Sequence, residues 1–177
     1  MMVGIPGSGK STKVKEMSGE GIIPFSSDKL RGEIFGDEGI QFTEEWLKEN
    51  NYDGPDDNQE KHNFALVIIF GELYRRIQVC LESGNDAVVD ATNPGKFARS
   101  RMIDKLGQYA DRIVAVVMAT PYAVCMKRNL NRDRVVSTDV MERMAKDFEY
   151  PELSEGIDEI ICIGDKADID YGITEQV

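Results

Sequence analysis

The chain has 177 residues, of which 41% are hydrophobic and 30% are charged, and its formal net charge is −11. This length suits one domain with its own core, and the sequence holds no apolar run of about 18 residues that would indicate a membrane span. An acidic surface repels polyanions, so the composition argues against broad, non-specific binding to nucleic acid but leaves room for one strand end in a local basic site.

Short apolar runs alternate with longer amphipathic stretches along the chain, which predicts an α/β fold with a mostly parallel sheet flanked by helices. The predicted strands end at Val3 or span residues 22–25, 86–90, 113–118 and 157–163, and the predicted helices span residues 10–17, 59–82, 96–110 and 139–148 or start near Ser27 and Pro121. Only three residues precede Gly4, so the first strand is very short unless the chain start is trimmed.

Residues 36–58 interrupt this alternation with several glycines and with eight acidic residues against one basic residue, Lys48. Such a composition predicts an irregular, solvated flap. Trp46 and Tyr52 lie within the flap, and we interpret them as hydrophobic anchors that pin it to the body, with base stacking as the alternative. The acidic residues near the C-terminus predict a loose tail over residues 165–177.

The strongest motif lies between the first predicted strand and helix, where Gly4, Gly9, Lys10 and Ser11 match G-x-x-x-x-G-K-[ST]. Glycines let backbone N–H groups turn inward around a phosphate, and the helix that follows points its positive end at the same phosphates. Lys10 would add a charge for the β- and γ-phosphates of ATP, and Ser11 would offer its hydroxyl to Mg²⁺. The loop residues predicted to bind ATP are Gly4, Pro6, Gly7, Ser8, Gly9, Lys10, Ser11 and Thr12.

A second motif, Ser26-Ser27-Asp28-Lys29-Leu30-Arg31, follows the second predicted strand. Strand ends on this side of an open α/β sheet face the ligand. Asp28 could take the proton from an acceptor hydroxyl as a general base, and Arg31, one helical turn later, could hold an acceptor phosphate. The alternative is that Ser27 or Asp28 only caps the helix.

A third motif, Val88-Val89-Asp90-Ala91-Thr92-Asn93, is a buried strand that delivers an acid and two hydrogen-bonding side chains to the same edge of the sheet. The alternative is a plain turn in which Asn93 and the following proline start the next helix.

A fourth motif is the basic run from Lys127 to Arg134, in which Arg128 and Arg132 are four residues apart. A helix would place both on one face, where two guanidinium groups could stabilise the charge on a transferring phosphoryl group. The alternative is a solvated basic face. With Lys10 and Asp28, these arginines complete the predicted catalytic set.

In this order, the four motifs resemble those of the polynucleotide 5′-hydroxyl kinases of phages and bacteria, over roughly residues 3–163. The resemblance implies a P-loop kinase domain over residues 1–164, similar to adenylate kinase, with a helical lid at 128–136. It also implies that Asp28 is the general base, that Arg31 binds the phosphate beside the acceptor hydroxyl, that Asp90, Thr92 and Asn93 line the acceptor side, and that Arg128 and Arg132 cover ATP.

We therefore expect transfer of the γ-phosphate of ATP, with Mg²⁺, to the 5′-hydroxyl end of DNA or RNA. A kinase of a small-molecule alcohol, such as a nucleoside or sugar, is the alternative that the net charge favours. A nucleotide-binding switch is a third interpretation, but the Asn-Lys-x-Asp motif of guanine-nucleotide switches is not in the sequence. Three well-separated cysteines and no signal-peptide pattern predict a cytoplasmic protein, and His62, the only histidine, is expected to have a surface or capping role.

Overall fold

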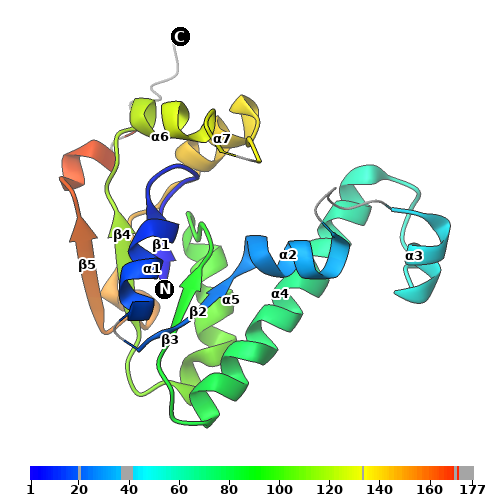
Figure 1. Cartoon of the computed structure of the whole chain (residues 1–177), viewed down its shortest axis with the longest axis horizontal. Helices are drawn as coiled ribbons and strands as arrows, with labels where there is room; N and C mark the ends of the chain where they lie inside the picture. The colour runs from blue at the N-terminus through cyan, green and yellow to red at the C-terminus, as the bar shows by residue number, and fades with distance from the viewer. Residues whose placement is uncertain (20, 37–41, 133, 170, 172–177) are drawn as a thin grey trace.

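The computed structural model describes residues 1–177 with the exception of residues 20, 37–41, 133, 170 and 172–177 (Figure 1). Its strands are β1 (Met2–Val3), β2 (Ile23–Ser26), β3 (Ala87–Asp90), β4 (Val114–Met118) and β5 (Glu159–Ile163). Its α-helices are α1 (Lys10–Gly19), α2 (Ser27–Phe35), α3 (Glu44–Glu49), α4 (Asn58–Glu82), α5 (Lys96–Leu106), α6 (Tyr122–Asn129) and α7 (Thr138–Lys146). Short 3₁₀ turns are η1 (Gly107–Tyr109), η2 (Leu153–Glu155) and η3 (Lys166–Ile169).

The strands pair in parallel, β1 with β4, β4 with β5 and β2 with β3. The amide of Gly4, directly after β1, donates a hydrogen bond to the carbonyl of Thr92, just beyond β3, at 3.0 Å. The two ladders therefore lie side by side in the order β2-β3-β1-β4-β5 (Figure 1). Because parallel strands end at the same edge, this order brings the segments after β1, β2 and β3 together.

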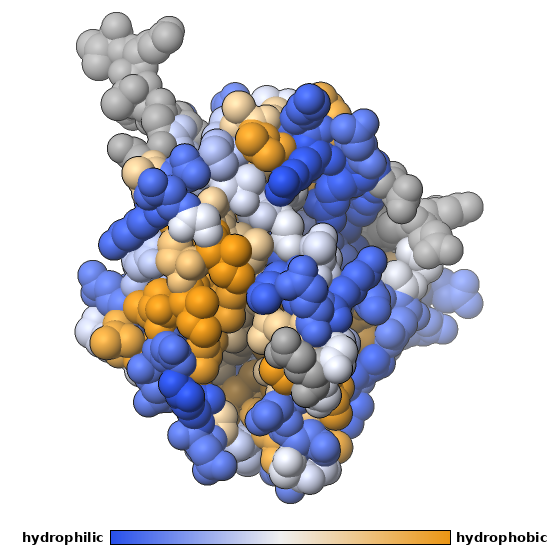
Figure 2. Space-filling view, turned by 60° about the vertical axis from the view of Figure 1, so that its left-hand side comes forward, coloured by the Kyte–Doolittle hydropathy of each residue, from blue (hydrophilic) through white to orange (hydrophobic). Residues whose placement is uncertain are grey.

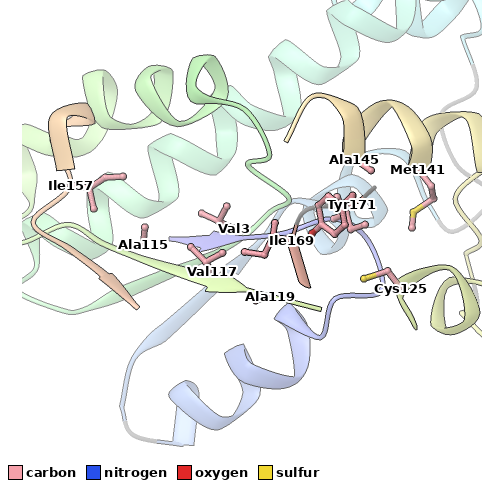
Figure 3. Packing of buried hydrophobic residues seen from close by; sticks show 11 residues of the cluster. Val3, Ala115, Val117, Ala119, Cys125, Met141, Ala145, Ile157, Ile169 and Tyr171 are labelled. Atoms are coloured by element: carbon pink, nitrogen blue, oxygen red, sulfur yellow. The ribbon is translucent and has the colours of Figure 1, made fainter. Parts of the chain in front are cut away.

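Alternating side chains of the strands fill two layers of core, one on each face of the sheet. Met2 and Val116 pack with Val14 of α1 on one face, whereas Val3 and Val117 belong to the opposite face. Figure 3 shows that the second cluster continues to Met141 and Ala145 of α7. The buried residues of α4 and α5 pack with those of β3 and α2 in a further cluster, which contains Leu30, Ile69, Leu73, Ile77, Val89, Ala91, Met102 and Leu106. The predicted parallel sheet flanked by helices is therefore confirmed.

The flap contains a helix, α3, where the sequence predicted irregular structure, and Thr43 caps it by accepting from the amide of Trp46. The ring of Trp46 lies 5.4 Å from that of Phe35 in α2 and 6.1 Å from that of Phe64 in α4. The predicted role of Trp46 as an anchor to the body is confirmed by these contacts. Residues 37–41 of the flap lie outside the described part.

The prediction of a loose C-terminal tail is wrong for its described residues. Ile169 and Tyr171 are buried, and the ring of Tyr171 lies 5.4 Å from that of Phe148. These two apolar side chains stand among acidic residues in the sequence and pack into the core beside β4. The average composition of the tail does not indicate their burial. Residues 172–177 lie outside the described part.

Strand β5 is the edge of the sheet, and Ile161 is exposed there. Figure 2, which turns this side of the molecule toward the viewer, shows apolar side chains gathered on the surface. Among the described residues, no helix combines the length and the apolar character that crossing a membrane requires.

Candidate active site

The phosphate loop runs from the end of β1 to the start of α1 and depends on glycine for its shape. Gly7 and Gly9 have φ angles of 80° and 96°, a region that disfavours residues with a Cβ. A Cβ on Gly7 would also lie 2.3 Å from the carbonyl oxygen of Cys125 in α6. Thr120, just after β4, donates its hydroxyl to the carbonyl of Ser8 at 2.9 Å. The loop is thus packed against the end of β4 and the first turn of α6.

Lys10 is buried at the start of α1, with its ammonium group turned back into the loop. Its Nζ donates to the carbonyl of Ile5 at 2.9 Å and to the hydroxyl of Ser8 at 3.4 Å. Burial lowers the pKa of Lys10 to about 8, and the nearby carboxylate of Asp90 partly opposes this. No carboxylate among the described residues forms an ion pair with Lys10 within 4 Å, and a buried ammonium without such a pair is costly, so the loop is suited to receive negative charge.

The donor set of the loop fits a nucleoside triphosphate with Mg²⁺. The glycines leave no Cβ in the cradle, Lys10 supplies the cation, and Ser11 and Thr12 expose their hydroxyls in the first turn of α1. Ser11 is the residue that would contact Mg²⁺, since a hydroxyl oxygen is a ligand that this hard cation accepts.

The segment after β3 lies against the phosphate loop. Asp90 is half-buried and close enough to Lys10 to affect its pKa. The carbonyl of Thr92 accepts from Gly4, and the side-chain amide of Asn93 donates to the carbonyl of Met2 at 2.9 Å. The buried Asn93 side chain therefore joins β3 to β1, and the predicted contacts of Asp90, Thr92 and Asn93 with an acceptor stay predictions.

Asp28 lies in the first turn of α2 and is exposed. The cap of α2 is Ser26, whose hydroxyl accepts from the amide of Lys29 at 3.4 Å. The alternative in which Ser27 or Asp28 caps the helix is therefore wrong, because both residues already lie within its first turn. The carboxylate of Asp28 instead faces two arginines of the lid, with 3.4 Å to Nη2 of Arg132 and 3.6 Å to Nη1 of Arg134.

Arg31 lies one turn further along α2 and is half-buried. Its Nε is buried without a hydrogen-bond partner among the described residues. Burial lowers the pKa of Arg31, the charge of Arg134 lowers it further, and Asp28 opposes both. The pKa of His62 on α4 is lowered by burial and then by Arg31 and Arg134. We call Asp28, Arg31, His62 and Arg134 the acceptor cluster; its charged groups are two guanidinium groups and one carboxylate, and the lowered pKa of His62 favours a neutral imidazole.

The helix predicted to start near Pro121 is present as α6, but the predicted lid over residues 128–136 is not one continuous helix. Helix α6 ends at Asn129, whose buried side-chain amide donates to the carbonyl of Val136 at 2.7 Å and accepts from its amide at 3.1 Å. These bonds turn the chain back, so the prediction that Arg128 and Arg132 share a helix face is wrong. Nη1 of Arg128 lies 3.5 Å from the carbonyl of Gly7, and Arg132 reaches Asp28. The guanidinium group of Arg128 therefore lies at the phosphate loop, and that of Arg132 lies at Asp28.

Three residues near the site could not be recognised from the sequence. Arg134 belongs to the basic run without a distinct role there, and the position of His62 predicts only a surface or capping role. Arg99 in α5 is fully buried and gave no sequence signal, because an arginine in an amphipathic helix usually faces solvent.

Comparisons with known proteins identify the family and the fold. A family model described as an AAA domain matches residues 1–151. The structure is similar to that of a presumed kinase from Chloroflexus aurantiacus, at 17% identity and a TM-score of 0.64 over 92% of this chain and 81% of that chain. It is also similar to a gluconokinase from Sinorhizobium meliloti, at 15% identity and a TM-score of 0.52 over 96% of this chain and 85% of that chain. None of the curated proteins compared with the chain matches it. At these identities the structural likeness establishes the fold, which is the predicted one.

Proposed function

The chain belongs to the AAA domain family and has the fold of the P-loop kinases, and we propose that it transfers the γ-phosphoryl group of ATP to the hydroxyl of a small-molecule alcohol. One observation carries the proposal: the lid arginine Arg132 contacts the exposed carboxylate of Asp28. This contact joins the nucleotide side of the site, formed by the phosphate loop and the lid, to a candidate general base on the acceptor side.

On the nucleotide side, the phosphate loop and Lys10 would hold the phosphates, and Ser11 would help to hold Mg²⁺. When bound, Mg²⁺ supplies positive charge to the phosphate oxygens. Arg128 lies beside Gly7 and Arg132 beside Asp28, so their guanidinium groups can stabilise the negative charge that spreads over the transferring phosphoryl group.

On the acceptor side, Asp28 would take the proton of the alcohol. The alcohol oxygen forms a bond to the γ-phosphorus while the bond from this phosphorus to the bridging oxygen of ADP breaks, and ADP leaves. General bases of this kind contribute roughly 10²–10⁴-fold to the rate. The ion pairs of Asp28 with Arg132 and Arg134 are long and exposed, and exposed pairs are weak, so an arriving substrate can replace them at little cost.

The acceptor cluster indicates the kind of alcohol. The cluster places two guanidinium groups, those of Arg31 and Arg134, close together in a chain whose net charge is −11. The Nε of Arg31 has no partner among the described residues. Arginine binds carboxylates and phosphates through parallel, charge-assisted hydrogen bonds. We infer that the alcohol carries an anionic group near its reacting hydroxyl. A small molecule meets this need without bringing a long polyanion to an acidic surface, and one similar structure is that of a gluconokinase.

A second candidate acceptor is the 5′-hydroxyl end of DNA or RNA. The motif from Ser26 to Arg31, with the motif from Asp90 to Asn93, favours it through the resemblance to polynucleotide kinases. A strand end also presents a phosphate beside its 5′-hydroxyl, which Arg31 could bind. Both acceptors would therefore bind the acceptor cluster through an anionic group, and they differ in the size of the molecule that carries this group.

A transfer assay with radiolabelled ATP distinguishes these acceptors. The panel pairs neutral and anionic alcohols of similar size: a sugar with its sugar acid, a nucleoside with its 3′-phosphate, and 5′-hydroxyl oligonucleotides of increasing length. We expect the small anionic alcohols to be the best substrates. Rates that increase with oligonucleotide length would move the assignment to polynucleotide kinase, and no transfer to any alcohol would reject the proposed function.

A further inference from the structure

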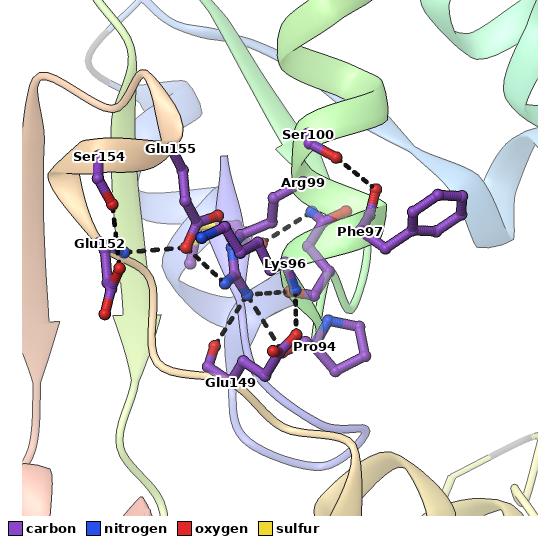
Figure 4. Close-up of polar contacts among 11 residues, drawn as sticks. Pro94, Lys96, Phe97, Arg99, Ser100, Glu149, Glu152, Ser154 and Glu155 are labelled. Carbon is purple, nitrogen blue, oxygen red and sulfur yellow. Dashed lines mark hydrogen bonds and ion pairs between the residues drawn. The ribbon is translucent and has the colours of Figure 1, made fainter.

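Arg99 is a fully buried arginine whose side chain is surrounded by hydrogen-bond acceptors (Figure 4). Its Nε and Nη2 donate to the two carboxylate oxygens of Glu155, each at 2.8 Å. Its Nη1 donates to the carbonyls of Asn93 at 3.2 Å, Pro94 at 3.1 Å and Glu149 at 2.9 Å. One side chain thus connects two segments that are about fifty residues apart in the sequence.

A buried ion pair is weak evidence for a contribution to stability, because the desolvation of both charges offsets their attraction. The pair can still fix the local geometry, because the guanidinium group binds Glu155 along one edge and backbone carbonyls along the other. Glu155 fixes its plane through two parallel bonds, and the remaining nitrogen then holds the carbonyls of Asn93 and Pro94. The pair therefore fixes the loop between β3 and α5.

This loop contains a strained residue. Asn93 has a φ of 44°, a conformation that residues other than glycine adopt rarely and keep only where the surroundings hold them from several sides. Its side-chain amide is held by Met2, its carbonyl is held by Arg99, and the carbonyl of the preceding Thr92 is held by Gly4. The strained turn is thus bound directly to the first glycine of the phosphate loop.

The segment that supplies Glu155 is itself attached to the start of α5. The backbone amide of Lys96 donates to the carboxylate of Glu149 at 2.6 Å, and the amide of Glu152 donates to that of Glu155 at 3.0 Å. This segment follows α7, the helix after the lid. Arg99 therefore connects the chain that leaves the lid with the loop that follows β3.

We propose that Arg99 is a positioning residue for phosphoryl transfer. Held by Glu155, it fixes the loop from Thr92 to Gly95 against the phosphate loop and so sets where an acceptor lies relative to the γ-phosphate. This role rests on the proposed function, since it concerns the acceptor of that reaction. Arg99 touches neither ATP nor the acceptor and acts only through the loop that it holds.

The test uses Glu155→Gln, which keeps the shape of the side chain but removes the charge that orients Arg99. Hydrogen exchange of the unliganded protein is followed over residues 91–97, together with ATP binding and the kinetics of transfer. We expect exchange in this loop to increase at least tenfold and kcat/KM for the acceptor to fall at least tenfold, with the Kd for ATP within twofold of the native value. Arg99→Lys keeps the positive charge but cannot form the forked contacts, so it should share the defect.

Two controls separate positioning from a general loss of stability. Arg112→Met removes the exposed ion pair of Arg112 with Glu159 and should change neither loop exchange nor transfer. Leu73→Ala destabilises a buried position in α4 and should lower the Tm without a selective loss for the acceptor.

Unchanged exchange in residues 91–97 of Glu155→Gln, wild-type transfer by Arg99→Lys, or an equal acceptor defect in Leu73→Ala would overturn the positioning role. If the native protein transfers phosphate to no alcohol, the proposed function fails. The exchange data then still decide whether Arg99 holds the loop.

Discussion

Replacement of Gly7 by alanine would push the phosphate loop away from α6 by a distance that follows from the structure. The new Cβ would lie 2.3 Å from the carbonyl oxygen of Cys125, whereas ordinary contact begins at 3.4 Å, so the loop and α6 must separate by about 1 Å. Arg128 lies in α6 with its Nη1 3.5 Å from the carbonyl of Gly7, and it moves with the helix. A misplacement of about 1 Å can cost on the order of 10²-fold in rate.

Gly84 provides a matched control for this experiment. Its φ of 77° is close to the 80° of Gly7, but no atom lies within 4 Å of a Cβ built there. Alanine in this left-handed conformation costs about 1–2 kcal/mol at either position, which corresponds to a decrease in Tm of about 2–8 °C for a domain of this size. We expect Gly84→Ala to lose only stability. Gly7→Ala should lose stability and also about 100-fold in kcat/KM for ATP.

Thermal melting, nucleotide binding and steady-state transfer are measured on both variants and on the native protein. Normal ATP affinity and turnover in Gly7→Ala would refute the assignment of this loop to the phosphates. An equal loss of activity in Gly84→Ala would show that stability, rather than the contact with α6, explains the effect.

Three further substitutions test the roles of individual side chains. Lys10→Met should abolish transfer without unfolding the protein. Because burial lowers the pKa of Lys10 to about 8, Lys10 loses its charge as the pH rises through that value, and the ATP affinity of the native protein should fall. Binding titrations of the variant should lack this fall. Asp28→Asn should lower kcat by about 10²-fold or more with little change in the Kd for ATP, and a variant with native turnover would remove Asp28 as the base. Arg31→Ala should raise KM only for anionic acceptors, whereas Lys29→Ala, on an exposed part of the same helix, should not; salt should weaken the preference for anions in the native protein.

The parts of the site that follow from local sequence could be predicted. The glycine spacing and Lys10 specify the phosphate loop, because the motif needs only a preceding strand and a following helix. Asp28 and Arg31 could be placed near the site, because parallel strands end at one edge. The family model and the similar structures agree with the predicted P-loop kinase fold, whereas the roles of the site residues stay predictions and the polynucleotide acceptor remains one of two candidates.

The parts that depend on long-range contacts could not be predicted. The four-residue spacing of Arg128 and Arg132 fits one helix face, but the helix ends at Asn129, whose side chain bonds to Val136. Arg99 resembles a surface residue of α5 in the sequence, because the acceptors around it come from distant segments. Tyr171 is similarly hidden in an acidic segment, because its burial depends on Phe148, distant in the chain.

The strengths of the contacts around the site divide it into a fixed part and an adaptable part. The ends of β1 and β3 are joined by buried hydrogen bonds of 2.9–3.0 Å, and Arg99 adds the buried, bidentate pair with Glu155 at 2.8 Å. The lid instead meets Asp28 through partly exposed pairs of 3.4 and 3.6 Å. Because short buried contacts resist rearrangement and long exposed ones are weak, substrates would meet a preformed phosphate loop and a preformed loop from Thr92 to Gly95. The arginines of the lid are then the groups that can reorient from the base to the transferring phosphoryl group.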